Sequence, residues 1–151
     1  MKTGFLTTAL FLVATLSGAA TAQAEHTILQ CKVQNTELGR WISPEVVIAY
    51  SPGSKKAIVS DPIIMHFYKR PLEAKVKDRK SKISLYWRVK NVSDSAAQAL
   101  PSMEYSATIF KGSPKFTISA RPQGRPQTFS GRGTCSPLKN VGKWKKYLKN
   151  L

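Results

Sequence analysis

The sequence has few of the residues that enzymes use for catalysis or for holding metals. It contains two cysteines, two histidines, and eight Asp and Glu among 151 residues. Motifs typical of hydrolases, nucleotide-binding proteins and zinc enzymes, such as G-x-S-x-G, H-E-x-x-H and C-x-x-C, are absent. Ser60, Asp61 and His66 lie close in the sequence, but they carry no such motif, and we assign them no catalytic role. We therefore expect a protein that is not an enzyme and that uses no cofactor and no metal.

Long apolar runs are also missing after the N-terminus. The first residues combine the basic Lys2, an apolar run over 5–16 and the small-residue sequence Ala22-Gln23-Ala24, which together are typical of a cleaved export signal. The run is too short for a membrane-spanning helix, which needs about 20 apolar residues. We predict cleavage before Glu25, a periplasmic or secreted product, and a single domain over 25–138 with a separate tail over 139–151.

The two cysteines predict a single disulfide. Export places the chain in an oxidising compartment, and neither Cys31 nor Cys135 has a second cysteine or a histidine at metal-ligand spacing. The bond would join the first strand to the last. Because it closes about 100 residues, it would contribute roughly 4 to 5 kcal/mol in the chain-entropy model.

Short alternating segments separated by Gly, Pro, Ser and Asn clusters indicate an all-β fold. The clearest segment, 82–92, alternates Ile83, Leu85, Trp87 and Val89 with polar residues. Residues 63–69 follow a proline and indicate either a further strand or an irregular crossing, and residues 91–102, which contain the glycosylation acceptor sequence Asn91-Val92-Ser93, indicate a loop. Eight strands are predicted, over 27–35, 45–50, 56–60, 72–77, 82–92, 103–110, 115–121 and 129–135.

Eight consecutive antiparallel strands with a disulfide between the ends favour a small closed barrel, which has no exposed sheet edges. Gly131 and Gly133 lie two residues apart, so both fall on one face of the last strand and permit a sharp bend or a close neighbour. A sandwich is the alternative. Its immunoglobulin form is disfavoured because Trp87 follows Cys31 by 56 residues.

The element Gly39-Arg40-Trp41 resembles the G-x-W element of lipocalins, which are secreted eight-stranded barrels. The resemblance implies a lipocalin-like barrel that carries a small apolar ligand, with Trp41 sealing one end. The resemblance covers only these three residues. Here a strand precedes the element, whereas lipocalins have it at the opening of their first strand.

The charge balance predicts anionic partners. Lys and Arg number 24 against eight Asp and Glu, and from Tyr105 to the C-terminus there are ten cations and no carboxylate side chain. Such a surplus attracts anionic lipid headgroups, lipopolysaccharide, acidic glycans or nucleic acid. We do not expect nucleic acid, because the export signal and the inward alternation of Trp87 argue against a base-stacking surface.

Two segments concentrate these cations. If 72–77 pairs with 82–92, a solvent-facing set of basic side chains shares one wall, comprising Lys75, Lys77, Lys82, Arg88 and Lys90. The tail spaces Val141, Trp144, Leu148 and Leu151 at helical intervals, which predicts a cationic amphipathic helix over 139–151 or a segment that becomes one on binding. Its predicted anion- or membrane-binding residues are Lys143, Trp144, Lys145, Lys146 and Lys149.

The leading interpretation is a non-enzymatic envelope protein that binds anionic lipids, lipopolysaccharide or acidic glycans. Two alternatives stay open, a carrier of a small apolar ligand and a protein inhibitor of an envelope or host enzyme. The tail has two alternatives of its own: it contacts a membrane peripherally, or it packs on the barrel.

Overall fold

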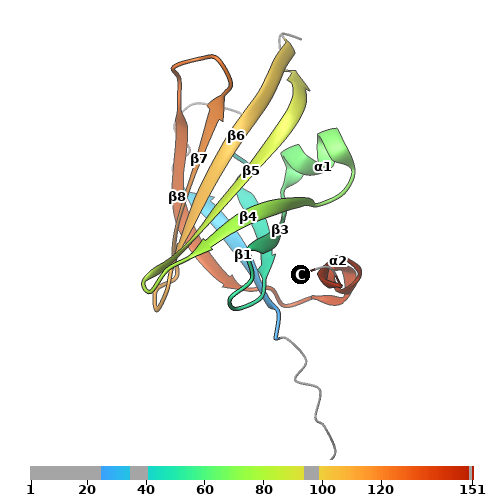
Figure 1. Cartoon of the computed structure of the whole chain (residues 1–151), viewed down its shortest axis with the longest axis vertical. Helices are drawn as coiled ribbons and strands as arrows, with labels where there is room; N and C mark the ends of the chain where they lie inside the picture. Colours follow the sequence, from blue (N-terminus) through green and yellow to red (C-terminus); the bar gives the residue numbers. More distant parts are fainter. Residues whose placement is uncertain (1–24, 35–40, 94–98, 150) are drawn as a thin grey trace, which may run out of the picture.

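The protein is an eight-stranded closed barrel (Figure 1), seen in a computed structural model that describes residues 25–34, 41–93, 99–149 and 151. All strands are antiparallel, and each pairs with its neighbours in sequence. The predicted barrel is thus confirmed, whereas the predicted export signal lies outside the described residues. The strands are β1 (Thr27–Gln34), β2 (Glu45–Tyr50), β3 (Lys56–Ser60), β4 (Leu72–Asp78), β5 (Lys82–Ser93), β6 (Ala99–Phe110), β7 (Lys115–Pro122) and β8 (Phe129–Pro137).

The barrel closes at the seam between β1 and β8. Cys31 and Cys135 are direct partners across this seam and form the predicted disulfide. Gly133 lies opposite Val33, and a methyl group added at Gly133 would overlap the backbone carbonyl of Lys32. The absence of a side chain therefore lets the two strands approach closely, as the glycine pair indicated.

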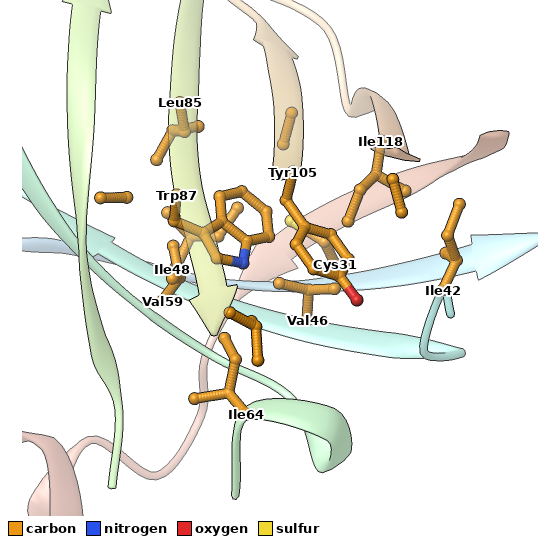
Figure 2. Packing of buried hydrophobic residues seen from close by; sticks show 14 of the residues in the cluster. Cys31, Ile42, Val46, Ile48, Val59, Ile64, Leu85, Trp87, Tyr105 and Ile118 are labelled. Atoms are coloured by element: carbon orange, nitrogen blue, oxygen red, sulfur yellow. The ribbon is translucent and has the colours of Figure 1, made fainter. Parts of the chain in front are cut away.

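Large side chains fill the middle of the barrel (Figure 2). Trp87 of β5 and Tyr105 of β6 are cross-strand partners whose rings stack with centroids 5.2 Å apart. The predicted inward face of β5 is confirmed, since its alternate residues are buried: Ile83, Leu85, Trp87 and Val89. An eight-stranded barrel is narrow enough to be filled in this way.

Residues 63–69 form most of a helix, so the strand or irregular crossing predicted there is wrong. Helix α1 (Pro62–Tyr68) follows Asp61, whose carboxylate accepts a 2.7 Å hydrogen bond from the Ile64 backbone N–H. Pro62 occupies the first helical position, where a missing N–H costs no hydrogen bond. With seven residues, the helix has only about two turns in which a helical period can appear. Its Ile64 points into the core (Figure 2).

The loop predicted over 91–102 is mostly strand. β5 continues to Ser93 and β6 begins at Ala99, so Asn91-Val92-Ser93 lies within a strand; residues 94–98 of the predicted loop are outside the described part. The buried face changes at Asn91, which has a φ of 55°, and Val92 is buried together with its partner Leu100. This change of face interrupts the alternation that the sequence prediction followed.

The C-terminal tail packs on the outer wall of the barrel. It forms a short 3₁₀ helix, η1 (Gly142–Trp144), and one turn of α-helix, α2 (Lys145–Leu148), beside the lower half of the barrel in Figure 1. Leu148 is buried with Ile28 and Ala49, and Trp144 packs partly against the same cluster. The predicted C-terminal helix is therefore confirmed, but it is shorter than the whole tail, because helical structure in the described part of the tail covers only Gly142–Leu148. Among the described residues, no helix has the length and apolarity to cross a membrane.

Candidate functional site

The tail borders two open grooves. The first, here called the β1 groove, has a volume of about 680 Å³ and runs along the start of β1. Its walls include Ile28, Leu138, Val141 and Leu148, with Lys145 and Lys149 also lining it. The second, the α1 groove, has a volume of about 420 Å³ and separates the tail from α1. Its walls include Met65, Pro71, Trp144 and Tyr147, with Lys143 and Lys146 also lining it.

Each groove therefore combines apolar walls with two lysines. Met65 and Val141 are among the few large apolar side chains in the described chain that are exposed, at 39% and 38% of their surface, and each lines one of the grooves. Lys146 also places its ammonium group 4.8 Å from the ring centroid of Tyr147. An anionic amphiphile needs this combination, because its chain requires apolar contact and its headgroup requires positive charge.

The structure brings the predicted tail residues together. It also shows which of their side chains are buried against the barrel. Leu148 is buried and Trp144 is partly buried against the outward faces of β1 and β2. These faces are apolar at this point, as Val47 and Ala49 of β2 show. The apolar stripe of the tail is thus covered by the barrel at Trp144, Leu148 and Leu151, whereas Val141 stays exposed. Of the two alternatives for the tail, packing on the side of the barrel is the arrangement in this structure.

The second predicted group lies on the outer face of β4 and β5, and we call it the basic wall: Lys75, Lys77, Lys82, Arg88 and Lys90. Lys75 is the cross-strand partner of Tyr86, and Lys77 that of Ser84. Lys56 of β3 lies opposite Lys75 and extends the positive charge by one strand. The pairing of 72–77 with 82–92, on which the shared face depended, is therefore observed.

Ion pairs neutralise the carboxylates near the basic wall. Glu73 pairs with Lys56 at 3.1 Å, Glu104 pairs with Arg88, and Asp78 pairs with Lys111. In the described part of the chain, no ion pair involves four cations of the wall, namely Lys75, Lys77, Lys82 and Lys90. Their charge is available to an external anion. Lys77 also lies 5.6 Å from the ring centroid of Tyr86, which is 42% exposed.

Asp61 and His66 form no hydrogen bond or ion pair with each other in the described structure. His66 is exposed and packs edge-on against Phe67, with ring centroids 4.9 Å apart. Asp61 is buried as the N-cap of α1, and its second carboxylate oxygen has no hydrogen-bond partner among the described residues. Burial raises the pKa of Asp61 to about 6, although hydrogen bonds from the Ile64 and Ile63 backbone oppose this shift.

Sequence reasoning missed the grooves and the contribution of Met65. Met65 belongs to α1, which was not predicted as a helix. Both grooves depend on where the tail packs, and no local pattern in the tail specifies that contact. The apolar outward positions of β1 to β3, namely Ile28, Val47, Ala49 and Ile58, were the one available signal, because an exposed barrel face with such residues needs a cover.

Comparisons of this chain with protein-family models, with curated proteins and with solved structures found no match. Function must then be inferred from the side chains of this chain and their arrangement.

Proposed function

We propose that the protein is a non-enzymatic, exported binding protein that associates peripherally with anionic lipid headgroups or lipopolysaccharide in the cell envelope. One observation supports this proposal above the others. The tail holds its lysines in two pairs. Lys143 and Lys146 line the α1 groove, and Lys145 and Lys149 line the β1 groove. A lipid or lipopolysaccharide molecule would contact the lysines through its anionic headgroup. An acyl chain partly withdrawn from the membrane would contact the apolar walls of the grooves.

The basic wall supports the same partner as a second, weaker contact. Its four lysines have no carboxylate partner in the described structure, whereas Lys56, on the next strand towards the tail, is paired with Glu73. Each lysine near an anionic membrane contributes about 1 kcal/mol. Because exposed charges are screened within about 10 Å at 0.1 M salt, binding should weaken as salt increases.

The test is co-sedimentation with vesicles of phosphatidylglycerol, with neutral phosphatidylcholine vesicles, and with lipopolysaccharide, each at low and high salt. A tail variant carries K143Q, K145Q, K146Q and K149Q. Its matched control, K32Q with K115Q, R121Q and R125Q, removes the same charge from exposed positions of β1, β7 and the turn after β7. We expect the tail variant to lose at least tenfold in affinity for anionic vesicles and the control to lose far less.

Two results would contradict the proposal. Equal, salt-insensitive binding to anionic and neutral vesicles would exclude association led by charge. Equal losses in the tail variant and in its control would show that only the overall charge matters and that the grooves contribute nothing. Circular dichroism and the emission of Trp144, measured as the difference from a Trp144→Phe variant because Trp41 and Trp87 also emit, would verify that the tail variant keeps its packing on the barrel.

A further inference from the structure

One end of the barrel is open and forms an apolar pocket that the tail and the basic wall do not include. This mouth pocket has a volume of about 420 Å³ and lies at the end that carries the β2–β3, β4–β5 and β6–β7 turns. Inward-facing residues of four strands line it, namely Leu29, Ile83, Ile109 and Cys135, together with Tyr50 and Phe110. Its volume falls within the range of small-molecule sites.

The pocket ends where the packed interior begins. Leu85 and Phe116 are fully or almost fully buried, and Trp87 stacks on Tyr105 deeper in the barrel. A ligand can therefore enter the mouth but cannot occupy the middle of the barrel. This differs from the carrier that the lipocalin resemblance implied, in which the ligand lies inside the barrel.

The polar groups of the mouth pocket do not carry a net charge. Asp78 and Lys111 both line it and form an ion pair with each other. The remaining polar side chains are hydroxyls, from Thr27, Tyr50 and Ser113. Burial raises the pKa of Tyr50 and Asp78 adds to the shift, although a hydrogen bond with the Thr27 side chain and the charge of Lys111 oppose it; the phenol therefore stays protonated and can donate a hydrogen bond at neutral pH.

We infer that the mouth pocket binds a small, uncharged, predominantly apolar molecule with one hydrogen-bonding group. The apolar walls accept its body, and the hydroxyls of Thr27 and Tyr50 are placed to meet its polar group. A charged headgroup is disfavoured because it would have to separate Asp78 from Lys111 or remain next to the like-charged partner. This ligand differs in charge from the anionic partner proposed for the tail, so the two sites can be tested separately.

The β1 groove meets the mouth pocket at the beginning of β1. Thr27 and Leu29 line both. An apolar molecule that leaves the lipid next to the tail would thus reach the mouth pocket along β1. It would not have to cross the polar outer face of β5 to β8. The mouth pocket is then placed to receive apolar molecules from the surface to which the tail is proposed to bind.

The test uses N-phenyl-1-naphthylamine, a neutral, largely apolar fluorophore with one N–H donor, with its sulfonated analogue 1-anilinonaphthalene-8-sulfonate as the anionic comparison. Titration of the intact protein at high salt, where attraction by its net positive charge is screened, should give saturable binding of the neutral probe at one site. We expect the neutral probe to bind at least tenfold more tightly than the anionic one. Amide chemical-shift changes should centre on Leu29, Ile83 and Ile109.

Thr27→Trp should block the pocket from a partly exposed rim position and weaken binding of the neutral probe at least tenfold. Because Thr27 also lines the β1 groove, Ser113→Trp, at a rim position that lines the mouth pocket but not the β1 groove, should give a similar loss. Its matched control, Thr117→Trp, introduces the same side chain at a half-buried position of β7 outside the residues that line the pocket. Ile109→Ala, which widens the pocket without blocking it, should retain saturable binding if the protein folds. Should Thr27→Trp fail to fold, the chemical-shift map of the unaltered protein decides the matter.

Several outcomes would overturn the inference: no saturable binding of the neutral probe, tighter binding of the anionic probe at high salt, or shift changes confined to Val141, Leu148 and the rest of the β1 groove. Because the vesicle experiment depends on lysines of the tail and this one on residues of the mouth, failure of either proposal leaves the other intact.

Discussion

Replacing Asp61 with asparagine should abolish a pH dependence of stability that this buried carboxylate creates. Asp61 is 5% exposed, and burial raises its pKa from 3.8 to about 6. The folded protein therefore binds a proton at Asp61 more tightly than the unfolded chain does. The stabilisation that this proton provides is complete below the unfolded pKa and is lost as pH rises through the folded pKa.

The magnitude follows from the size of this shift. The difference between 3.8 and about 6 corresponds to about 3 kcal/mol, since one pKa unit is 1.36 kcal/mol. Because pH 4 already lies just above the unfolded pKa, the free energy of unfolding should fall by about 2 kcal/mol of this total between pH 4 and pH 7. Asparagine is as good an N-cap as aspartate and does not titrate. At pH 7.5, Asp61→Asn should therefore be more stable than the unaltered protein, and at pH 4 the two should be nearly equal.

Urea unfolding of both proteins at intervals from pH 4 to pH 8 measures this difference directly. Glu73→Gln is the matched control, because Glu73 is exposed and its ion pair with Lys56 lies at the surface, where such pairs contribute at most about 1 kcal/mol. Its stability should follow that of the unaltered protein across the whole pH range. Parallel stability curves for Asp61→Asn and the unaltered protein would refute the reasoning and show that water or local opening solvates the carboxylate.

Three further predictions concern the seam and the tail. Gly133→Ala should destabilise the barrel by about 3 kcal/mol or more, because its methyl group meets the backbone of Lys32. Gly131→Ala should destabilise it less, because its methyl group meets only the side chain of Val33. Equal unfolding midpoints for the two variants would contradict this. The double variant Cys31→Ala, Cys135→Ala should have a free energy of unfolding lower by roughly 4 kcal/mol in the chain-entropy model, because the bond joins residues 104 positions apart. An unchanged urea midpoint would show that the seam hydrogen bonds alone close the barrel. Leu148→Ala should release the tail and lower the free energy of unfolding by about 2 kcal/mol. The emission of Trp144 should then shift to longer wavelength. Unchanged emission would mean that Trp144 packs on the barrel without Leu148.

The barrel could be predicted because its signals are local and repeat. Each strand alternates inward and outward residues, and the turns contain glycines such as Gly53 and Gly112, which adopt φ values of 75° and 72°. The disulfide followed from the export signal and from the positions of the two cysteines. The strand pairing then followed from the preference of consecutive strands for antiparallel neighbours.

Other features could not be predicted because they depend on contacts between distant residues. Helix α1 is stabilised by its cap at Asp61 and by burial of Ile64 in the barrel end, and neither effect leaves a periodic pattern in seven residues. The change of face at Asn91 needs a backbone conformation that the sequence Lys90-Asn91-Val92 permits but does not require. The site residues of the tail were identified by type, whereas their division between two grooves depends on the packing of Leu148.

Packing of the tail on the barrel also changes how its lysines can act. A free cationic helix would have to fold as it binds a membrane, and ordering its residues would reduce the affinity. Here Leu148 and Trp144 are already held by Ile28 and Ala49, so the lysines of the tail start from fixed backbone positions. Binding then costs less conformational entropy, as in other preorganised sites. The same packing keeps Leu148 and part of Trp144 against the barrel, so the tail cannot insert these side chains deeply into a bilayer, and contact near the headgroups is favoured.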